Sequence, residues 1–134
     1  MARTGIRASA IIIKGGKILL IHRKKDGEEY WVFPGGGIED NETWDEALIR
    51  EVKEETALDV KKHKLSFMNL SDIDNKEHPF YICEVSEGEA KMIGEETQRN
   101  SPDNWYQLEW VELKNLSELR LLPENAKEKV IKLK

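Results

Sequence analysis

The stretch from Pro34 to Leu58 constrains the fold of this chain more than any other part of the sequence. Three glycines follow Pro34 and end a short aromatic segment, so the backbone here can approach another group closely. Thr43, with Glu46 three residues later, forms a capping box, which marks the start of a helix. Apolar residues then recur at helical spacing and predict a helix over residues 44–56. The fold must therefore dock a helix directly after a glycine-rich segment.

The acidic residues of this predicted helix gather on one edge. At about 100° per residue, Glu51, Glu54 and Glu55 fall within roughly 100° of arc. Like charges at this spacing repel each other, and a hard divalent cation bound by oxygen ligands removes the repulsion. The adjacent face carries the apolar side chains expected to anchor the helix on a sheet: Leu48, Ile49 and Val52. One face therefore anchors the helix while the next presents carboxylates.

Two neighbours of the acidic edge can complete a site. A backbone carbonyl of the glycine-rich segment can supply one more oxygen to a metal ion. Arg50 precedes Glu51 directly, and its guanidinium can hold a carboxylate through two parallel hydrogen bonds. Glu51 and Glu42 are both candidate partners. A pair of glutamates is usually a solvated helix face and three glycines are usually a loop, so the combination at fixed offsets is what indicates a site.

The rest of the chain reads as strands around this helix. We expect strands over the following residues: 8–13, 17–23, 30–33, 65–70, 79–85 and 105–113. Turns over 14–17 and 25–28 join the first three strands. Residues 91–103 are expected to be loop-rich, 116–122 to include a short helical piece, and a last helix to begin near Pro123, which suits the first helical position. This order implies an α/β fold with helices on the faces of a mixed sheet.

Composition limits the classes of function. The 134 residues fit one domain over residues 1–134. The net charge of −5, without a basic stripe, argues against a nucleic-acid partner. The single cysteine, Cys83, excludes a disulfide within the chain and favours a reducing compartment. The first residues lack a signal-peptide pattern, and the longest apolar run, 10–13, is too short to cross a bilayer. We therefore expect a soluble, cytoplasmic protein with no membrane partner.

The stretch from residue 36 to residue 58 resembles the Nudix box of the Nudix (MutT-like) hydrolase family. Its fixed positions are held here by Gly36, Glu42, Arg50, Glu51, Val52, Glu54, Glu55 and Leu58. Ala57 departs from the box, because the family usually has glycine there. We expect Ala57 at the helix end in a left-handed conformation, at a cost on the order of 1 kcal/mol and away from the carboxylates. Asn41 also stands where many members have glycine, and asparagine tolerates that conformation better than most residues.

The resemblance implies a Nudix-type α/β/α sandwich with a mixed β-sheet and a Mg²⁺-dependent hydrolase, with Mn²⁺ as a substitute ion. The residues implied to be catalytic are Glu51, Arg50 and Glu54; Arg50 would orient Glu51, which is a candidate to deprotonate the attacking water. The implied metal ligands are Glu51, Glu54, Glu55, the carbonyl oxygen of Gly35 and, from a later loop, Glu95 or Glu96. The candidate substrate contacts are Gly36, Gly37, Arg23 and Trp31.

The resemblance leaves the substrate open. It implies a nucleoside diphosphate linked to another group, as in a nucleoside triphosphate, an oxidised nucleotide or a nucleotide sugar. Aromatic residues that can stack on a base or fill the core are Tyr30, Trp31, Phe80 and Trp105. The histidines lack metal-ligand spacing and are not expected to be catalytic: His22, His63 and His78. Two alternatives stay open: a Nudix-fold domain that senses a nucleotide without cleaving it, and an RNA-end processing enzyme, against which the acidic charge argues. A homodimer is a further candidate state.

Overall fold

The computed structural model describes residues 3–91 and 104–133. The elements in chain order are β1 (Arg3–Lys14), β2 (Lys17–Lys25), β3 (Glu28–Val32), β4 (Gly35–Glu39), α1 (Trp44–Thr56), β5 (Val60–Leu70), β6 (Glu77–Val85), β7 (Asn104–Glu112), the 3-10 helix η2 (Leu113–Glu118), β8 (Leu121–Leu122) and α2 (Glu124–Ile131). Within these ranges, no helix is long and apolar enough to span a membrane.

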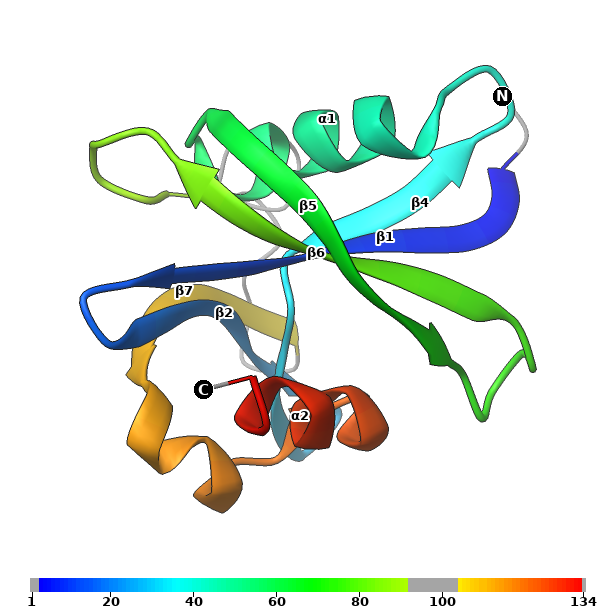
Figure 1. Cartoon of the computed structure of the whole chain (residues 1–134). Coiled ribbons are helices and arrows are strands. Elements are labelled where there is room, and N and C mark those ends of the chain that lie inside the picture. The colour runs from blue at the N-terminus through cyan, green and yellow to red at the C-terminus, as the bar shows by residue number, and fades with distance from the viewer. Residues whose placement is uncertain (1–2, 92–103, 134) are drawn as a thin grey trace.

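The described strands form one mixed, curled sheet. Six of them follow the order β5-β6-β1-β2-β3-β8, while β4 pairs with β1 and β7 pairs with β2. The β1–β6 and β3–β8 pairs are parallel, and the other pairs are antiparallel. Strands β1 and β2 pair only beside their turn. Away from the turn they separate, and the sheet divides into two halves that curl apart (Figure 1).

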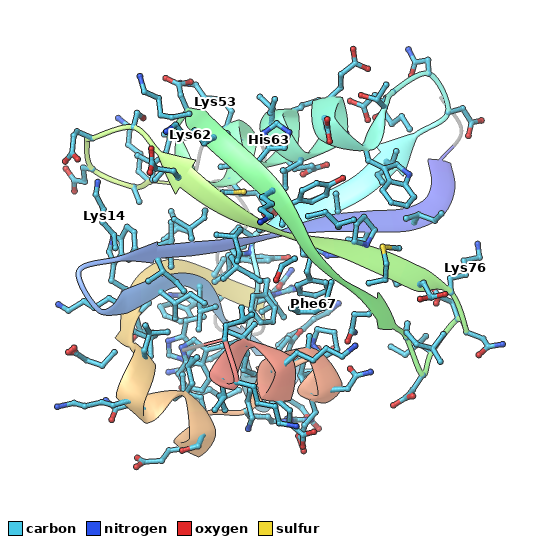
Figure 2. All side chains as sticks on the ribbon, in the orientation of Figure 1. Lys14, Lys53, Lys62, His63, Phe67 and Lys76 are labelled. Carbon is cyan, nitrogen blue, oxygen red and sulfur yellow. The ribbon has the colours of Figure 1, made fainter. Side chains whose placement is uncertain are left out.

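Helices cover the two faces of this sheet. Figure 1 shows α1 on one side of the strands and α2 on the other. Side chains alternate along β1: Ala8, Ala10 and Ile12 join the core under α1, whereas Ile11 joins the core over α2. Phe67 of β5 packs against that second core and lies beside α2 in Figure 2. This confirms the predicted α/β/α sandwich.

The two hairpin turns predicted from glycine are present. Gly15 and Gly16 have φ of 60° and 78°, and Asp26 and Gly27 have φ of 53° and 82°. Two consecutive residues with positive φ are what a tight turn between antiparallel strands requires. The turns set β2 antiparallel to both β1 and β3, and so fix the register of the strands that lead into the glycine-rich segment.

Helix α1 has the predicted bounds and the predicted cap. Thr43 accepts a hydrogen bond from the Glu46 amide at 3.1 Å, and the Glu46 side chain accepts one from the Thr43 amide at 2.9 Å. The anchoring face differs from the prediction in one residue: Leu48 and Val52 are fully buried, but Ile49 is 42% exposed. Ala47 of the same helix is fully buried instead, so the face docked on the sheet includes Ala47, Leu48 and Val52.

Other predicted elements have different ends in the structure. Pairing with neighbouring strands extends β1, β2 and β5 beyond the predicted ranges. The helical piece expected within 116–122 begins earlier, at residue 113, and ends at 118. Pro123 is the residue before α2 and has an extended ψ of 146°, so it caps the helix rather than starting it. Most of the loop expected over residues 91–103 lies outside the described residues.

Candidate active site

The glycine-rich segment expected to be a loop is strand β4, which lies against the acidic edge of α1. Its residues pair with β1, with Gly35 opposite Ser9 and Gly36 opposite Ala8. A Cβ on Gly35, whose φ is +146°, would collide with the backbone of Ala8, and a Cβ on Gly36 would run into the carboxylate of Glu51. Glycine is therefore required at both positions by close approach, and the second position brings Glu51 against the sheet.

Glu51 is the buried member of the acidic edge, with 7% of its surface exposed. Its Oε2 accepts a hydrogen bond from Arg50 Nη1 at 3.0 Å. Burial raises the pKa of Glu51, the positive charge of Arg50 opposes that shift, and the neighbouring charge of Glu54 adds to it. A buried carboxylate under repulsion from a second one is costly unless a cation compensates it.

Arg50 binds both of the partners that its sequence position allowed. It grips Glu42 with two hydrogen bonds, from Nε to Oε2 at 2.6 Å and from Nη2 to Oε1 at 2.9 Å. Its remaining bonds reach Glu51, the carbonyl oxygen of Gly37 at 3.2 Å, and Glu54 at 3.4 Å. The hydrogen bond to Glu42 is the main reason that the pKa of Arg50 is raised. The guanidinium thus joins the loop before α1, strand β4 and the acidic edge.

Glu54 and Glu55 complete the edge in different environments. Glu55 accepts a hydrogen bond from the Gly35 amide at 2.7 Å, which ties the end of α1 to the start of β4. The Glu54 side chain is 52% exposed and can change rotamer at little cost. Three carboxylates on one helix therefore lie beside β4: one buried, one bound to the strand and one facing solvent.

The donor chemistry of this edge suits a hard divalent cation, because carboxylate oxygens are the ligands that such ions prefer. In the described part of the chain, no group of three or more Asp, Glu, His or Cys side chains is already drawn together around one point. Arg50 Nη1 instead lies between Glu51 and Glu54 and supplies the compensating charge. The exposed Glu54 has room to turn from Arg50 to a metal ion, so the residues fit the ion.

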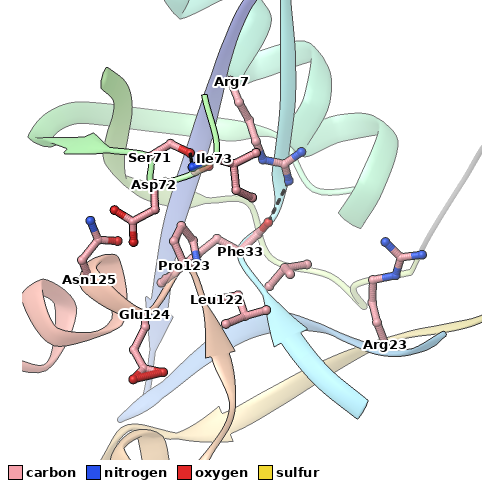
Figure 3. Close-up of a pocket in the computed structure, with 12 residues that line it drawn as sticks. Arg7, Arg23, Phe33, Ser71, Asp72, Ile73, Leu122, Pro123, Glu124 and Asn125 are labelled. Atoms are coloured by element: carbon pink, nitrogen blue, oxygen red, sulfur yellow. Dashed lines mark hydrogen bonds between the residues drawn. The ribbon is translucent and has the colours of Figure 1, made fainter. Parts of the chain in front are cut away.

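A cavity of about 470 Å³ opens on the sheet beside this edge. Arg7 of β1 and Arg23 of β2 line it, together with Phe33, the loop residues 71–73 and residues 122–125 before and within α2 (Figure 3). Apolar groups make up most of its wall, and its charged side chains are Arg7, Arg23, Asp72 and Glu124. A cavity of this size, with a few polar groups in an apolar wall, is typical of a small-molecule site.

Arg7 connects the cavity to the acidic edge. Its Nη2 donates a hydrogen bond to the carbonyl oxygen of Phe33 at 3.3 Å, just before the chain enters β4 (Figure 3). Its charge also acts on Glu51 and lowers the pKa of that carboxyl, although less than burial raises it. The cavity therefore lies next to the carboxylates, and an anionic group bound by Arg7 would be near Glu51.

Arg23, a predicted substrate contact, lines the cavity and is held by aromatic rings. Its guanidinium carbon lies 4.0 Å from the centre of the Tyr106 ring and 5.8 Å from that of Tyr30. Its Nη2 donates to Asn104 Oδ1 at 3.1 Å, while its buried Nε has no hydrogen-bond partner among the described residues. A rigid guanidinium with an unused donor is suited to an anionic ligand.

Trp31, the other predicted contact outside the box, is not among the residues that line this cavity. Its indole stacks on the His22 ring at 4.2 Å and donates a hydrogen bond to Glu109 at 2.9 Å. It packs against the core on the α2 side of the sheet. These contacts are those of a packed side chain, and the role of Trp31 as a substrate contact stays a prediction.

Some site residues lie beyond what the sequence indicated. Glu95 and Glu96, the candidate late ligands, lie outside the described residues. Arg7 and Asn125 line the cavity but were not singled out from the sequence. The signal that could have pointed to Arg7 is its place as a charged residue just before the apolar run 8–13. Nothing local marks Asn125, because the fold alone brings it to the cavity.

This chain is similar in sequence to known enzymes. An ADP-ribose pyrophosphatase from Methanocaldococcus jannaschii is 35% identical over 119 residues, which are 85% of this chain and 65% of that protein. An 8-oxo-dGTP diphosphatase from Proteus vulgaris is 42% identical over 57 residues, which are 41% of this chain and 51% of that protein. This chain therefore covers less than two thirds of the length of either relative.

Solved structures share the fold. A structure from work on MutT of Aliivibrio salmonicida and Vibrio cholerae has a TM-score of 0.69 at 23% identity, covering 94% of this chain and 91% of that chain. A MutT protein from Methanosarcina mazei has a TM-score of 0.67 at 21% identity, with 92% and 87% covered. The family model described as NUDIX domain matches residues 3–133. With a glycine strand, a gripping arginine and an acidic helix edge at the positions of the box, the chain belongs to the NUDIX domain family.

Proposed function

We propose that this chain is a Mg²⁺-dependent hydrolase that cleaves the diphosphate linkage of a small nucleotide-type substrate. The observation that carries the proposal is the placement of buried Glu51, held by Arg50 and pressed against Gly36, beside a cavity that two arginines line. A carboxylate held at this position by so many contacts has a role other than solvation. The family membership supports the same reaction class.

Glu51, Glu54 and Glu55 would hold the divalent ion, with the carbonyl oxygen of Gly35 as a further ligand. Mg²⁺ fits this all-oxygen set, and Mn²⁺ would substitute for it. When bound, the ion would neutralise the diphosphate, polarise phosphorus and lower the pKa of the attacking water. Glu95 or Glu96 stays a candidate for one more ligand.

The protein's own contribution is positioning and charge. Arg50 holds Oε2 of Glu51, and Oε1 would be the oxygen that accepts the proton of the reacting water. Burial favours that uptake, because it raises the pKa of Glu51. Arg7 and Arg23 would bind the phosphate oxygens, and the glycine backbone of β4 at Gly36 and Gly37 lets the substrate approach the edge closely. The diphosphate would then lie between the metal ion at the acidic edge and the two arginines of the cavity.

The cavity supports a nucleoside as the part of the substrate that is recognised. Its apolar wall, which includes Val32, Phe33 and Leu122, suits a base or a ribose, and its arginines suit phosphate. The relatives named for ADP-ribose and 8-oxo-dGTP make these two compounds the first substrates to test. A relative from Pasteurella multocida named RNA pyrophosphohydrolase, 37% identical over 59 residues, adds triphosphorylated RNA to the panel.

The test is release of phosphate or pyrophosphate from ADP-ribose, 8-oxo-dGTP, unmodified nucleoside triphosphates, nucleotide sugars and triphosphorylated RNA, with and without Mg²⁺. Turnover of a nucleotide that stops when the ion is chelated is the expected result. Glu55→Gln should abolish that turnover and leave the fold intact, because the amide oxygen can still accept the hydrogen bond from Gly35.

Glu84→Gln is the matched control, since Glu84 lies on an exposed position of β6 away from the acidic edge. It should retain full activity. Near-normal turnover by Glu55→Gln would refute the metal assignment. Tight nucleotide binding without turnover of any compound would favour the alternative of a sensing domain.

Location and assembly belong to the same proposal. We place the protein in the cytoplasm, where the lone thiol of Cys83 stays reduced, and we expect neither nucleic acid nor membrane as a partner. The net charge of −5 does not favour a nucleic-acid surface, and Lys14 and Lys76 lie at opposite ends of the molecule in Figure 2. A homodimer remains a candidate state, to be measured by light scattering.

A further inference from the structure

His78 joins two walls of the cavity. Its Nδ1 accepts a hydrogen bond from the backbone amide of Arg7 at 2.9 Å, and its Nε2 lies 3.2 Å from Asp74 Oδ2. Arg7 is on β1, while Asp74 belongs to the turn that carries the cavity residues 71–73. One imidazole ring therefore connects the strand wall to the loop wall.

The two hydrogen bonds fix which nitrogen carries the proton. The Arg7 amide can only donate, so Nδ1 must be unprotonated. Nε2 then holds the proton and donates it to the Asp74 carboxylate. The ring is well shielded, with 13% of the side chain exposed, and Asn69 faces it from the opposing strand β5. The neutral ring with hydrogen on Nε2 is the form that satisfies both the Arg7 amide and the Asp74 carboxylate.

The strand pairing explains why a side chain makes this bond. The parallel register of β1 with β6 begins at Ser9 opposite Phe80, so Arg7 lies just before the paired region. Its amide is bound by the His78 ring instead of a strand carbonyl. Strand β4 holds Arg7 on its other side, where Arg7 lies opposite Gly37. On the β6 side, the position of the Arg7 backbone depends on the His78 ring.

We propose that His78 is a positioning residue that sets Arg7 for the phosphate groups of the substrate, and that Asp74 fixes its tautomer. The inference rests on the proposed function, in which Arg7 binds phosphate. Among the described residues, the Arg7 side chain has one hydrogen bond, to the carbonyl oxygen of Phe33 at 3.3 Å, so a shift of its backbone moves the guanidinium relative to Glu51. The loss of His78 should therefore weaken binding of substrate rather than destroy the acidic edge.

Two substitutions test the two hydrogen bonds of the His78 ring separately. His78→Asn places an amide oxygen where Nδ1 lies and keeps an acceptor for Arg7, whereas His78→Gln places an amide nitrogen where Nε2 lies and keeps only the donor toward Asp74. We expect His78→Gln to raise KM about tenfold with little change in kcat, and His78→Asn to stay within about threefold of the unmodified protein. His63→Gln is the control, because His63 of β5 also faces an aspartate, Asp45 of α1, and neither of these two elements contributes a residue to the cavity wall.

Equal KM values in both His78 variants and the unmodified protein would overturn the proposal. Equal loss in both variants would also overturn it, since a merely structural ring would not distinguish them. A nitrogen-15 NMR spectrum of the unmodified protein at neutral pH tests the two hydrogen bonds of His78 without any turnover. A failure of this inference can therefore be distinguished from a failure of the proposed function. A neutral ring protonated on Nε2 is expected, and a proton on Nδ1 would contradict the arrangement.

Discussion

Arg50 and Glu42 form a two-bond ion pair between α1 and the segment before it, with N–O distances of 2.6 and 2.9 Å. Both side chains are largely shielded, at 28% and 14% exposure. The planar fork of arginine matches the two carboxylate oxygens, and lysine cannot reproduce this geometry. The pair therefore does more than neutralise charge: it fixes the direction from which Arg50 reaches Glu51.

Arg50→Lys should destabilise the protein by about 1–3 kcal/mol, because one ammonium cannot satisfy Glu42, Glu51 and the Gly37 carbonyl together. Turnover should fall by more than the loss of folded protein explains, since Glu51 loses its orienting partner. Urea unfolding and nucleotide hydrolysis measure the two effects. Lys53→Ala on the same helix is the control: its pair with Asp59 is exposed and should be worth less than about 1 kcal/mol. Equal losses in the two variants would contradict the role given to Arg50.

The sequence could predict those parts of the site that depend on nearby residues. The bounds of α1 followed from Thr43 and Glu46, whose reciprocal hydrogen bonds are local and leave few alternatives. The acidic edge followed from helical geometry, whereas Glu51 and Glu42 were candidate partners of Arg50 from their place in the sequence. Ala57 was expected in a left-handed conformation and has φ of 64° and ψ of 8°.

The parts that depend on long-range packing could not be predicted. Glycine has a low preference for strands, so β4 became visible only once β1 supplied its partner. The exposure of Ile49 follows from the direction in which α1 approaches the sheet, which helical periodicity does not specify. The cavity joins Arg7, Arg23 and Asn125, which are far apart in the chain and carry no common pattern.

Ala57→Gly should stabilise the protein. Alanine with positive φ costs on the order of 1 kcal/mol, and glycine removes most of this strain while adding some entropy to the unfolded chain. We expect a gain of about 0.5–1 kcal/mol by urea unfolding, with unchanged activity. Ala90→Gly has no such strain to relieve and should lower stability. A loss of stability in Ala57→Gly would show that the helix end is not strained in solution.

Cys83 should make the protein sensitive to alkaline pH. Burial raises the pKa of its thiol from 9.0 to about 12, so the folded state keeps a proton that the unfolded state releases. The stability that this provides is complete below about pH 9 and is lost progressively toward pH 12. Within that window the loss approaches about 1.4 kcal/mol per pH unit. Cys83→Ala should reduce the slope of unfolding free energy between pH 9 and 10, whereas parallel curves would contradict the burial of the thiol.

Gly36 and Glu51 should be energetically coupled. A Cβ on residue 36 would occupy the place of the Glu51 carboxylate, so Gly36→Ala must displace that group or separate α1 from β4. We expect Gly36→Ala to cost about 1–3 kcal/mol of stability as an overpacked contact and to remove most of the hydrolytic activity. In a Glu51→Ala background the space is vacant, and the same change should cost much less. Urea unfolding of the four proteins gives the coupling free energy, expected to exceed about 1 kcal/mol. Simple additivity would mean that Glu51 does not fill the space beside Gly36, and the acidic edge would then lack the buried carboxylate on which the proposed chemistry depends.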